Sequence, residues 1–186
     1  IIVVCVVGAG IVAGRIYGLW GDNLKIDISA LTMTENSIIY DSEGNVLAEL
    51  NGNESRKTIK LEEMSPYLPK AFIAIEDERF YQHHGVDFKR TTAAVLSFVT
   101  HFGKSTVGGG STITQQLVKN VTKDKEASGV DGVVRKIKEW AKAYQIENEL
   151  SKEQILELYL NLILMGKTNY GVEAGAEYYF NTTAKD

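Results

Sequence analysis

The stretch GGSTITQQLVKN, residues 109–120, leads from a glycine-rich loop into a helix. Ser111 and Thr112 are residue types that cap helix N-termini, and the residues from Ile113 to Val121 follow helical spacing. Free backbone N–H groups at such a helix start suit an anion. Two glutamines, three hydroxyls and a lysine surround that start, so the stretch predicts a helix that presents polar groups to a negatively charged ligand.

Helical spacing also precedes this stretch. Pro66 and Pro69 mark the entry to a segment in which Phe72, Ile73 and Ile75 can face a core. We therefore expect a helix that ends near the acidic residues that follow.

Downstream, the polar residues 123–132 are predicted to form a solvated loop, and residues 133–150 return to helical spacing. Ser151 and Gln154 form a capping box, which begins a further helix over residues 152–164. The fold class that these patterns predict is mainly α.

The N-terminal residues indicate a membrane anchor. Residues 1–14 carry no charge, and Tyr17 and Trp20 follow where an interfacial aromatic belt is expected. A full span needs about 20 apolar residues, so residues 1–20 are interpreted as the C-terminal part of a transmembrane helix. A signal peptide is the alternative, but no basic region precedes the run and no clear cleavage site follows it.

Residues 37–40 and 46–50 flank the turn-prone run 41–45, which predicts a short β-hairpin. The hairpin would lie in a linker, residues 21–60, between the anchor and the domain. With 186 residues and 44% hydrophobic side chains, the chain can bury one substantial core.

The charge balance excludes nucleic acid as a partner, since a net charge of -4 gives no basic excess. The single cysteine, Cys5, lies in the apolar N-terminal run and offers neither an internal disulfide nor a cysteine-based metal site. His83 and His84 have no third ligand at a recognised spacing, so a structural role is favoured over zinc binding.

Two further clusters could carry chemistry. Glu76, Asp77 and Glu78 follow an apolar run, and a carboxylate that loses hydration beside a core is a candidate general base, whereas a solvated helix end is the plain alternative. Arg135 and Glu139 lie four residues apart on one helix face, where an ordinary surface ion pair is the alternative to a binding site.

Five blocks together resemble, in their residues and in their order along the chain, motifs of the peptidoglycan glycosyltransferases of class A penicillin-binding proteins. The blocks are IEDERFYQHHG (75–85), GGSTITQQLVKN (109–120), RKIKE (135–139), SKEQILELYLN (151–161) and GVEAGAEYYF (171–180). The hairpin sequence IIYDSEGNVLAEL (38–50) is similar to the stretch that precedes this domain in the bifunctional proteins, and it favours them over monofunctional transferases.

The resemblance implies a lysozyme-like glycosyltransferase domain over residues 61–186, truncated at its C-terminal end. It implies an enzyme that polymerises lipid II, the lipid-linked disaccharide-peptide precursor, into glycan strands with inversion. A sugar hydroxyl needs a base, and a diphosphate leaving group needs its charge neutralised, so a carboxylate plus several cations is the expected set. A divalent cation, Mg or Mn, is expected beside the diphosphate.

The resemblance also assigns roles. Glu76 would take the proton from the acceptor 4-hydroxyl, and Glu139 would be the second essential carboxylate, near the donor diphosphate. The expected substrate-binding residues are Ser111, Thr112, Gln115, Gln116, Lys119, Arg135 and Lys136. The expected supporting residues are Asp77, Phe80, His83, Gly85 and Arg90.

One departure concerns the segment after Asp87, where relatives commonly carry proline and then an arginine about a turn later. This chain has Phe88, Lys89 and Arg90 there, with Ala93 further on.

Partners and place follow from the same resemblance. Expected partners are lipid II, the growing lipid-linked strand, the bilayer and a C-terminal transpeptidase domain in the full-length protein. The location expected is the cytoplasmic membrane, single-pass, with the catalytic domain on the extracellular or periplasmic face. The apolar run 93–102 is expected to contact the bilayer, with a buried core helix as the alternative.

Two other functions remain open. A lysozyme-like peptidoglycan hydrolase or lytic transglycosylase also places a glutamate at a helix end, but bond cleavage does not require the cations Lys119, Arg135 and Lys136. An inactive, membrane-anchored scaffold domain is the second, and the presence of both Glu76 and Glu139 argues against it.

Overall fold

The computed structural model describes residues 37–50, 55–100, 110–122 and 129–186, together with Ile26 and three glycines among residues 1–18. The predicted anchor, residues 1–20, otherwise lies outside the described residues and stays a prediction. Within the described ranges, no helix has the length and apolar character needed to cross a membrane.

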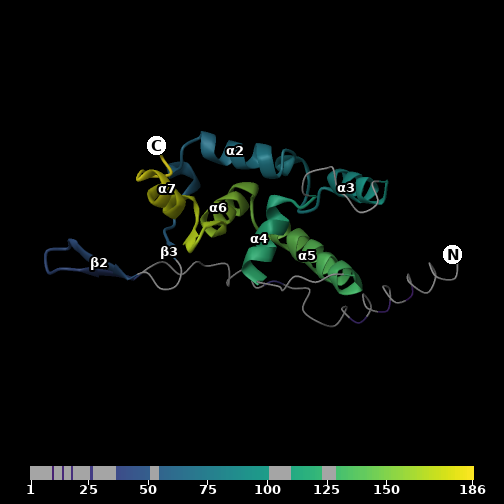
Figure 1. The fold of residues 1–186 in the computed structure, drawn as a ribbon, viewed down its shortest axis with the longest axis horizontal. Coiled ribbons are helices and arrows are strands. Elements are labelled where there is room, and N and C mark those ends of the chain that lie inside the picture. The colour runs from purple at the N-terminus through teal and green to yellow at the C-terminus, as the bar shows by residue number, and fades with distance from the viewer. Residues whose placement is uncertain are drawn as a thin grey trace.

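Helices make up most of the described ranges, so the mainly α fold class is confirmed (Figure 1). Their bounds are α2 Tyr67–Glu76, α3 Phe88–Thr100, α4 Ile113–Thr122, α5 Gly129–Glu149, α6 Lys152–Leu162 and α7 Val172–Phe180, with short 3-10 turns η2 Leu61–Glu63 and η3 Phe80–Gln82.

Helix α4 lies at the centre of the helical part (Figure 1). Its residues Ile113, Leu117 and Val118 are buried and form one apolar cluster with Ile146 of α5 and Ile155 of α6. A helix with this much apolar surface on one face is stable only when neighbours cover it. The polar start of α4 is therefore held in a fixed place by its own buried body.

Two predicted helix boundaries are wrong. Helix α5 begins at Gly129 instead of residue 133, because Asp131 in its first turn is exposed and suits the positive end of the helix dipole. Helix α6 ends at Leu162 instead of residue 164, because the backbone turns extended at Ile163 and Leu164 pairs with Tyr170. The capping box at the start of α6 is confirmed.

Strands β1 Ser37–Tyr40 and β2 Val46–Leu50 pair antiparallel and form the predicted hairpin. The Asp41 side chain accepts hydrogen bonds from the Glu43 and Asn45 backbone N–H groups, both at 2.8 Å, which closes the turn. The hairpin projects away from the helices (Figure 1). Its role as a linker stays a prediction.

A second, three-stranded sheet was not predicted. Strand β3 Ser55–Arg56 pairs parallel with β5 Asn169–Tyr170, and β4 Leu164–Gly166 pairs antiparallel with β5. The Asn161 side chain adds to this contact, since it accepts from the Ile59 N–H at 2.9 Å and donates to the Ile59 carbonyl at 2.8 Å. Part of the predicted linker is thereby joined to the far end of the domain.

Candidate active site

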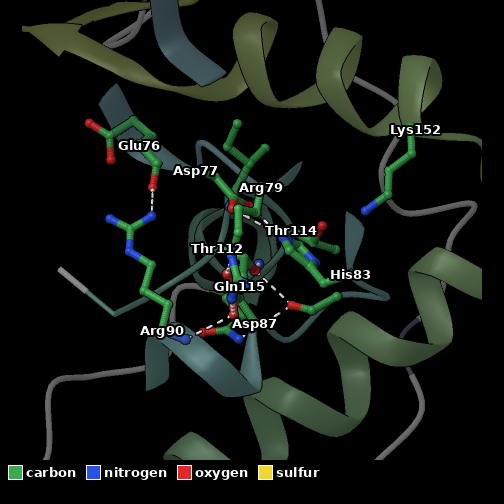
Figure 2. A network of polar contacts seen from close by, with 12 residues as sticks. Glu76, Asp77, Arg79, His83, Asp87, Arg90, Thr112, Thr114, Gln115 and Lys152 are labelled. Atoms are coloured by element: carbon green, nitrogen blue, oxygen red, sulfur yellow. Dashed lines mark hydrogen bonds and ion pairs between the residues drawn. The ribbon is translucent and has the colours of Figure 1, made fainter. Parts of the chain in front are cut away.

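The end of helix α2 presents two neighbouring carboxylates to different surroundings. Asp77 is fully buried, and it accepts hydrogen bonds from the Ile113 backbone N–H at 3.0 Å and from His83 Nε2 at 2.9 Å. Figure 2 shows the Glu76 carboxylate pointing away from this network. Asp77 therefore caps the start of α4 and leaves Glu76 half-buried at the edge of the fold.

Gly85 brings the first sequence block against the start of α4. Its carbonyl accepts from Thr112 Oγ1 at 2.6 Å and from Gln115 Nε2 at 3.3 Å. Thr112 Oγ1 also accepts from the Gln115 backbone N–H at 3.1 Å, so it caps α4 as predicted. Thr112 and Gln115 are both fully buried, which indicates that much of their hydrogen bonding holds the protein itself.

Asp87 connects the first block to helix α3. It is 2% exposed and pairs with the Arg79 guanidinium through Nε at 2.9 Å and through Nη2. It also accepts from the Arg90 N–H at 2.9 Å. Burial raises the pKa of Asp87, but the Arg90 N–H and the Arg79 guanidinium outweigh it, so the pKa lies below its usual value. This ion pair was not predicted.

Arg90 also reaches the residue that carries the candidate base. Its Nη1 donates to the Glu76 backbone carbonyl at 2.5 Å (Figure 2). A carbonyl in the last turn of a helix has no partner within that helix, so Arg90 satisfies one such group at the end of α2. The supporting role expected for Arg90 thus takes the form of a brace between α3 and α2.

The Glu76 carboxylate is held by an amide. Gln116 Nε2 donates to Glu76 Oε2 at 2.8 Å, and Gln116 Oε1 accepts from the Tyr159 hydroxyl at 3.1 Å. Gln116 was expected to bind substrate oxygens, and the structure places its amide on the candidate base. Nothing in the local pattern around Tyr159 distinguishes it from an ordinary core tyrosine.

Lys136 contacts three other residues that were expected in the site. Its Nζ donates to Ser111 Oγ at 2.8 Å and to Gln115 Oε1 at 3.0 Å, and it also pairs with Glu139. Arg135 Nη1 lies 3.1 Å from the other Glu139 oxygen. We call these five residues the lysine cluster.

The burial of Glu139 distinguishes it from a surface ion pair. Its side chain is 7% exposed, whereas Arg135 and Lys136 are 23% and 30% exposed. A carboxylate placed this deep needs compensating charge, and the two cations provide it. Because two partly exposed cations flank a single carboxylate, the lysine cluster can also receive an anion.

The remaining predicted residues lie around these groups. Lys119 is in the last turn of α4, exposed, one turn beyond Gln115 on the same side of the helix. Phe80 is fully buried, and the Lys152 ammonium lies 4.3 Å from its ring centroid. Lys119 thus extends the set of cations along α4, and Phe80 anchors the first block in the core.

A buried pair behind Phe80 was missed by sequence reasoning. Lys152 donates to Glu147 at 2.8 Å, and Glu147 also accepts from Thr114 Oγ1 at 2.6 Å. These contacts join α4, α5 and α6. The one available signal was Thr114, a polar residue at a core-facing position of α4.

The two carboxylates expected to be catalytic are both linked to the first turn of α4. Gln116 contacts Glu76, and its neighbour Gln115 contacts Lys136, which pairs with Glu139. The expected base and the expected anion-binding residues are therefore connected through adjacent residues of one helix. Transfer from a diphosphate donor requires a proton acceptor and groups that neutralise the leaving phosphate.

The described ranges contain no group of three or more His, Cys, Asp or Glu residues that could hold a metal ion. The Glu139 carboxylate, the expected neighbour of a diphosphate, already accepts from two cations. These protein groups alone do not make a fitting metal site. The Mg or Mn ion expected from sequence stays a prediction, and no chemical step is derived through it.

Comparisons with known proteins agree with this geometry. The Transglycosylase family model matches residues 43–186. Penicillin-binding protein 1A of Clostridium perfringens strain 13 is 43% identical over 165 residues, which are 87% of this chain and 24% of that protein. Penicillin-binding protein 1F of Bacillus subtilis strain 168 is 42% identical over 163 residues, 87% of this chain and 22% of that protein.

A monofunctional glycosyltransferase of Staphylococcus haemolyticus is 47% identical over 125 residues, which are 67% of this chain and 44% of that protein. The chain thus spans about a quarter of the penicillin-binding proteins that it matches and less than half of this shorter relative. The chain belongs to the Transglycosylase family, and its resemblance to the peptidoglycan glycosyltransferases is confirmed.

Proposed function

We propose that this chain is the glycosyltransferase domain of a bacterial cell-wall synthase and polymerises lipid II into glycan strands with inversion. The observation that carries the proposal is that two neighbouring glutamines in the first turn of α4 contact Glu76 and Lys136, Gln116 the first and Gln115 the second. A hydrolase needs an acid for the leaving oxygen and has no use for a buried carboxylate flanked by two cations.

In the proposed reaction, Glu76 accepts the proton of the acceptor 4-hydroxyl as that oxygen bonds to the anomeric carbon of the donor. The bond from this carbon to the diphosphate oxygen breaks in the same displacement, which inverts the anomeric centre. Polyprenyl diphosphate leaves with the bonding electrons, and Lys136, Arg135 and Lys119 stabilise its charge. The Gln116 amide holds one Glu76 oxygen, so the other oxygen is left to take the proton.

The wider setting is also part of the proposal. The full-length protein would carry the anchor of residues 1–20, a transpeptidase domain after this one, and the active site on the outer face of the cytoplasmic membrane. The names of the two penicillin-binding relatives support a larger protein of this kind. Helix α3 would contact the bilayer, although most side chains of the run 93–102 lie outside the described residues.

The test separates synthesis from cleavage. The full-length protein is incubated with lipid II in one arm and with finished glycan strands in the other, with Glu76→Gln as the matched control. We expect wild-type protein to elongate lipid II and leave finished strands intact, and Glu76→Gln neither to elongate lipid II nor to cleave finished strands. Cleavage of finished strands without elongation would instead establish a hydrolase or lytic transglycosylase.

A further inference from the structure

Three helices meet at the candidate base through one line of hydrogen bonds. Tyr159 of α6 donates from its hydroxyl to Gln116 Oε1 at 3.1 Å, and Gln116 of α4 donates from Nε2 to Glu76 Oε2 at 2.8 Å. Tyr159 is fully buried, and its ring packs edge-on against Phe72 of α2, with 6.1 Å between centroids. The hydroxyl therefore has a fixed position relative to the helix that carries Glu76.

The donors and acceptors along this line allow only one orientation of the amide. An ionised carboxylate can only accept hydrogen bonds, so Gln116 must turn its NH₂ group to Glu76 and its oxygen to Tyr159. Burial, and then the Glu76 charge, raise the pKa of Tyr159, so its hydroxyl stays protonated and can donate. With no donor at Tyr159, the amide oxygen loses its anchor, and the position of the NH₂ group beside the carboxylate is no longer fixed.

We propose that Tyr159 is a positioning residue that acts through Gln116 to keep the Glu76 carboxylate aimed as the base. The inference rests on the proposed function of Glu76. Tyr159 itself touches no reacting atom, and it contributes by fixing the position of the Gln116 amide that donates to the carboxylate. A small displacement of a catalytic group from its productive position lowers the rate, so loss of this anchor should slow the transfer.

The substitution Tyr159→Phe removes only the hydroxyl oxygen and leaves the packed ring. We expect kcat with lipid II to fall about 3- to 10-fold, the range for one lost hydrogen bond, with KM unchanged within about twofold. Tyr178→Phe is the matched control, since that hydroxyl bonds to Lys167 on the surface, and it should leave both properties unchanged.

A double-mutant cycle tests the route through Gln116. In a Gln116→Ala background the Tyr159 hydroxyl has nothing left to orient, so Tyr159→Phe should change kcat by less than about twofold. Additive losses, or a Tyr159→Phe enzyme with wild-type kcat, would overturn the inference. So would a lowered melting temperature with unchanged kcat, which indicates a purely structural hydroxyl.

Glu76→Gln is measured alongside, so that the two proposals fail separately. An inactive Glu76→Gln enzyme together with an unaffected Tyr159→Phe enzyme removes the role of Tyr159 alone. An active Glu76→Gln enzyme removes the base and the positioning role together.

Discussion

Replacing Gly85 with alanine tests how closely the first sequence block packs on helix α5. Gly85 has φ +80°, where an alanine costs about 1 to 2 kcal/mol. Its Cβ would lie 2.8 Å from both the carbonyl carbon and oxygen of Ala143 and 3.0 Å from the Tyr144 nitrogen. These are backbone atoms that cannot rotate away, and overpacking of this kind costs about 1 to 3 kcal/mol. The free energy of unfolding should therefore fall by about 2 to 5 kcal/mol.

The assay is thermal unfolding, and Gly129→Ala is the matched control. Gly129 also has a positive φ, +61°, but no atom lies within 4 Å of the position that its Cβ would take, so only the backbone cost remains. Gly85→Ala should lower the melting temperature by about 4 to 20 °C, at about 2 to 4 °C for each kcal/mol. If Gly85→Ala melts no lower than Gly129→Ala, the contact with α5 is not made and the reasoning is refuted.

Three further predictions concern the charged residues. Glu76→Gln should reduce lipid II polymerisation by about 10² to 10⁴ while precursor binding persists, and a rate within a few fold of wild type would contradict a base at this position. Arg135→Lys should lower the steady-state polymerisation rate and Arg135→Ala should lower it further, because a guanidinium can hold two phosphate oxygens; altered melting with unchanged turnover would count against phosphate binding. Asp87 should stabilise the fold above its ordinary pKa of 3.8 and lose that contribution as the pH falls through its lowered folded value, since burial is outweighed by the Arg90 N–H and the Arg79 guanidinium. Urea unfolding at a series of acidic pH values should therefore show a weaker pH dependence for Asp87→Asn, and an unchanged dependence would contradict the Asp87 contribution.

Local signals in the sequence were enough to predict several elements. The cap at Thr112, the capping box at Ser151 and the turn around Asp41 each act within four residues, so the helices and the hairpin that they begin or close were predicted. The three-stranded sheet was not, because strands of two or three residues such as β3 are too short to show a period and pair only through tertiary contacts.

In the site too, contacts within one helix were predicted and contacts between helices were not. Arg135 and Glu139, which belong to one block, were predicted to lie on one helix face because they are four residues apart, and the structure pairs them. The contact of Tyr159 with Gln116 and of Lys152 with Glu147 depends on how separate helices pack, which no local pattern encodes.

The parallel pairing of β3 with β5 sets an order of events during synthesis. Residues 55 and 56 precede their partners 169 and 170 by 114 positions, so at about 5 to 20 residues per second the first strand is made roughly 6 to 23 s before the second. The backbone of Ile59 likewise pairs with Asn161, which is made 102 residues later. This end of the domain therefore cannot close until the residues between the two strands have been synthesised.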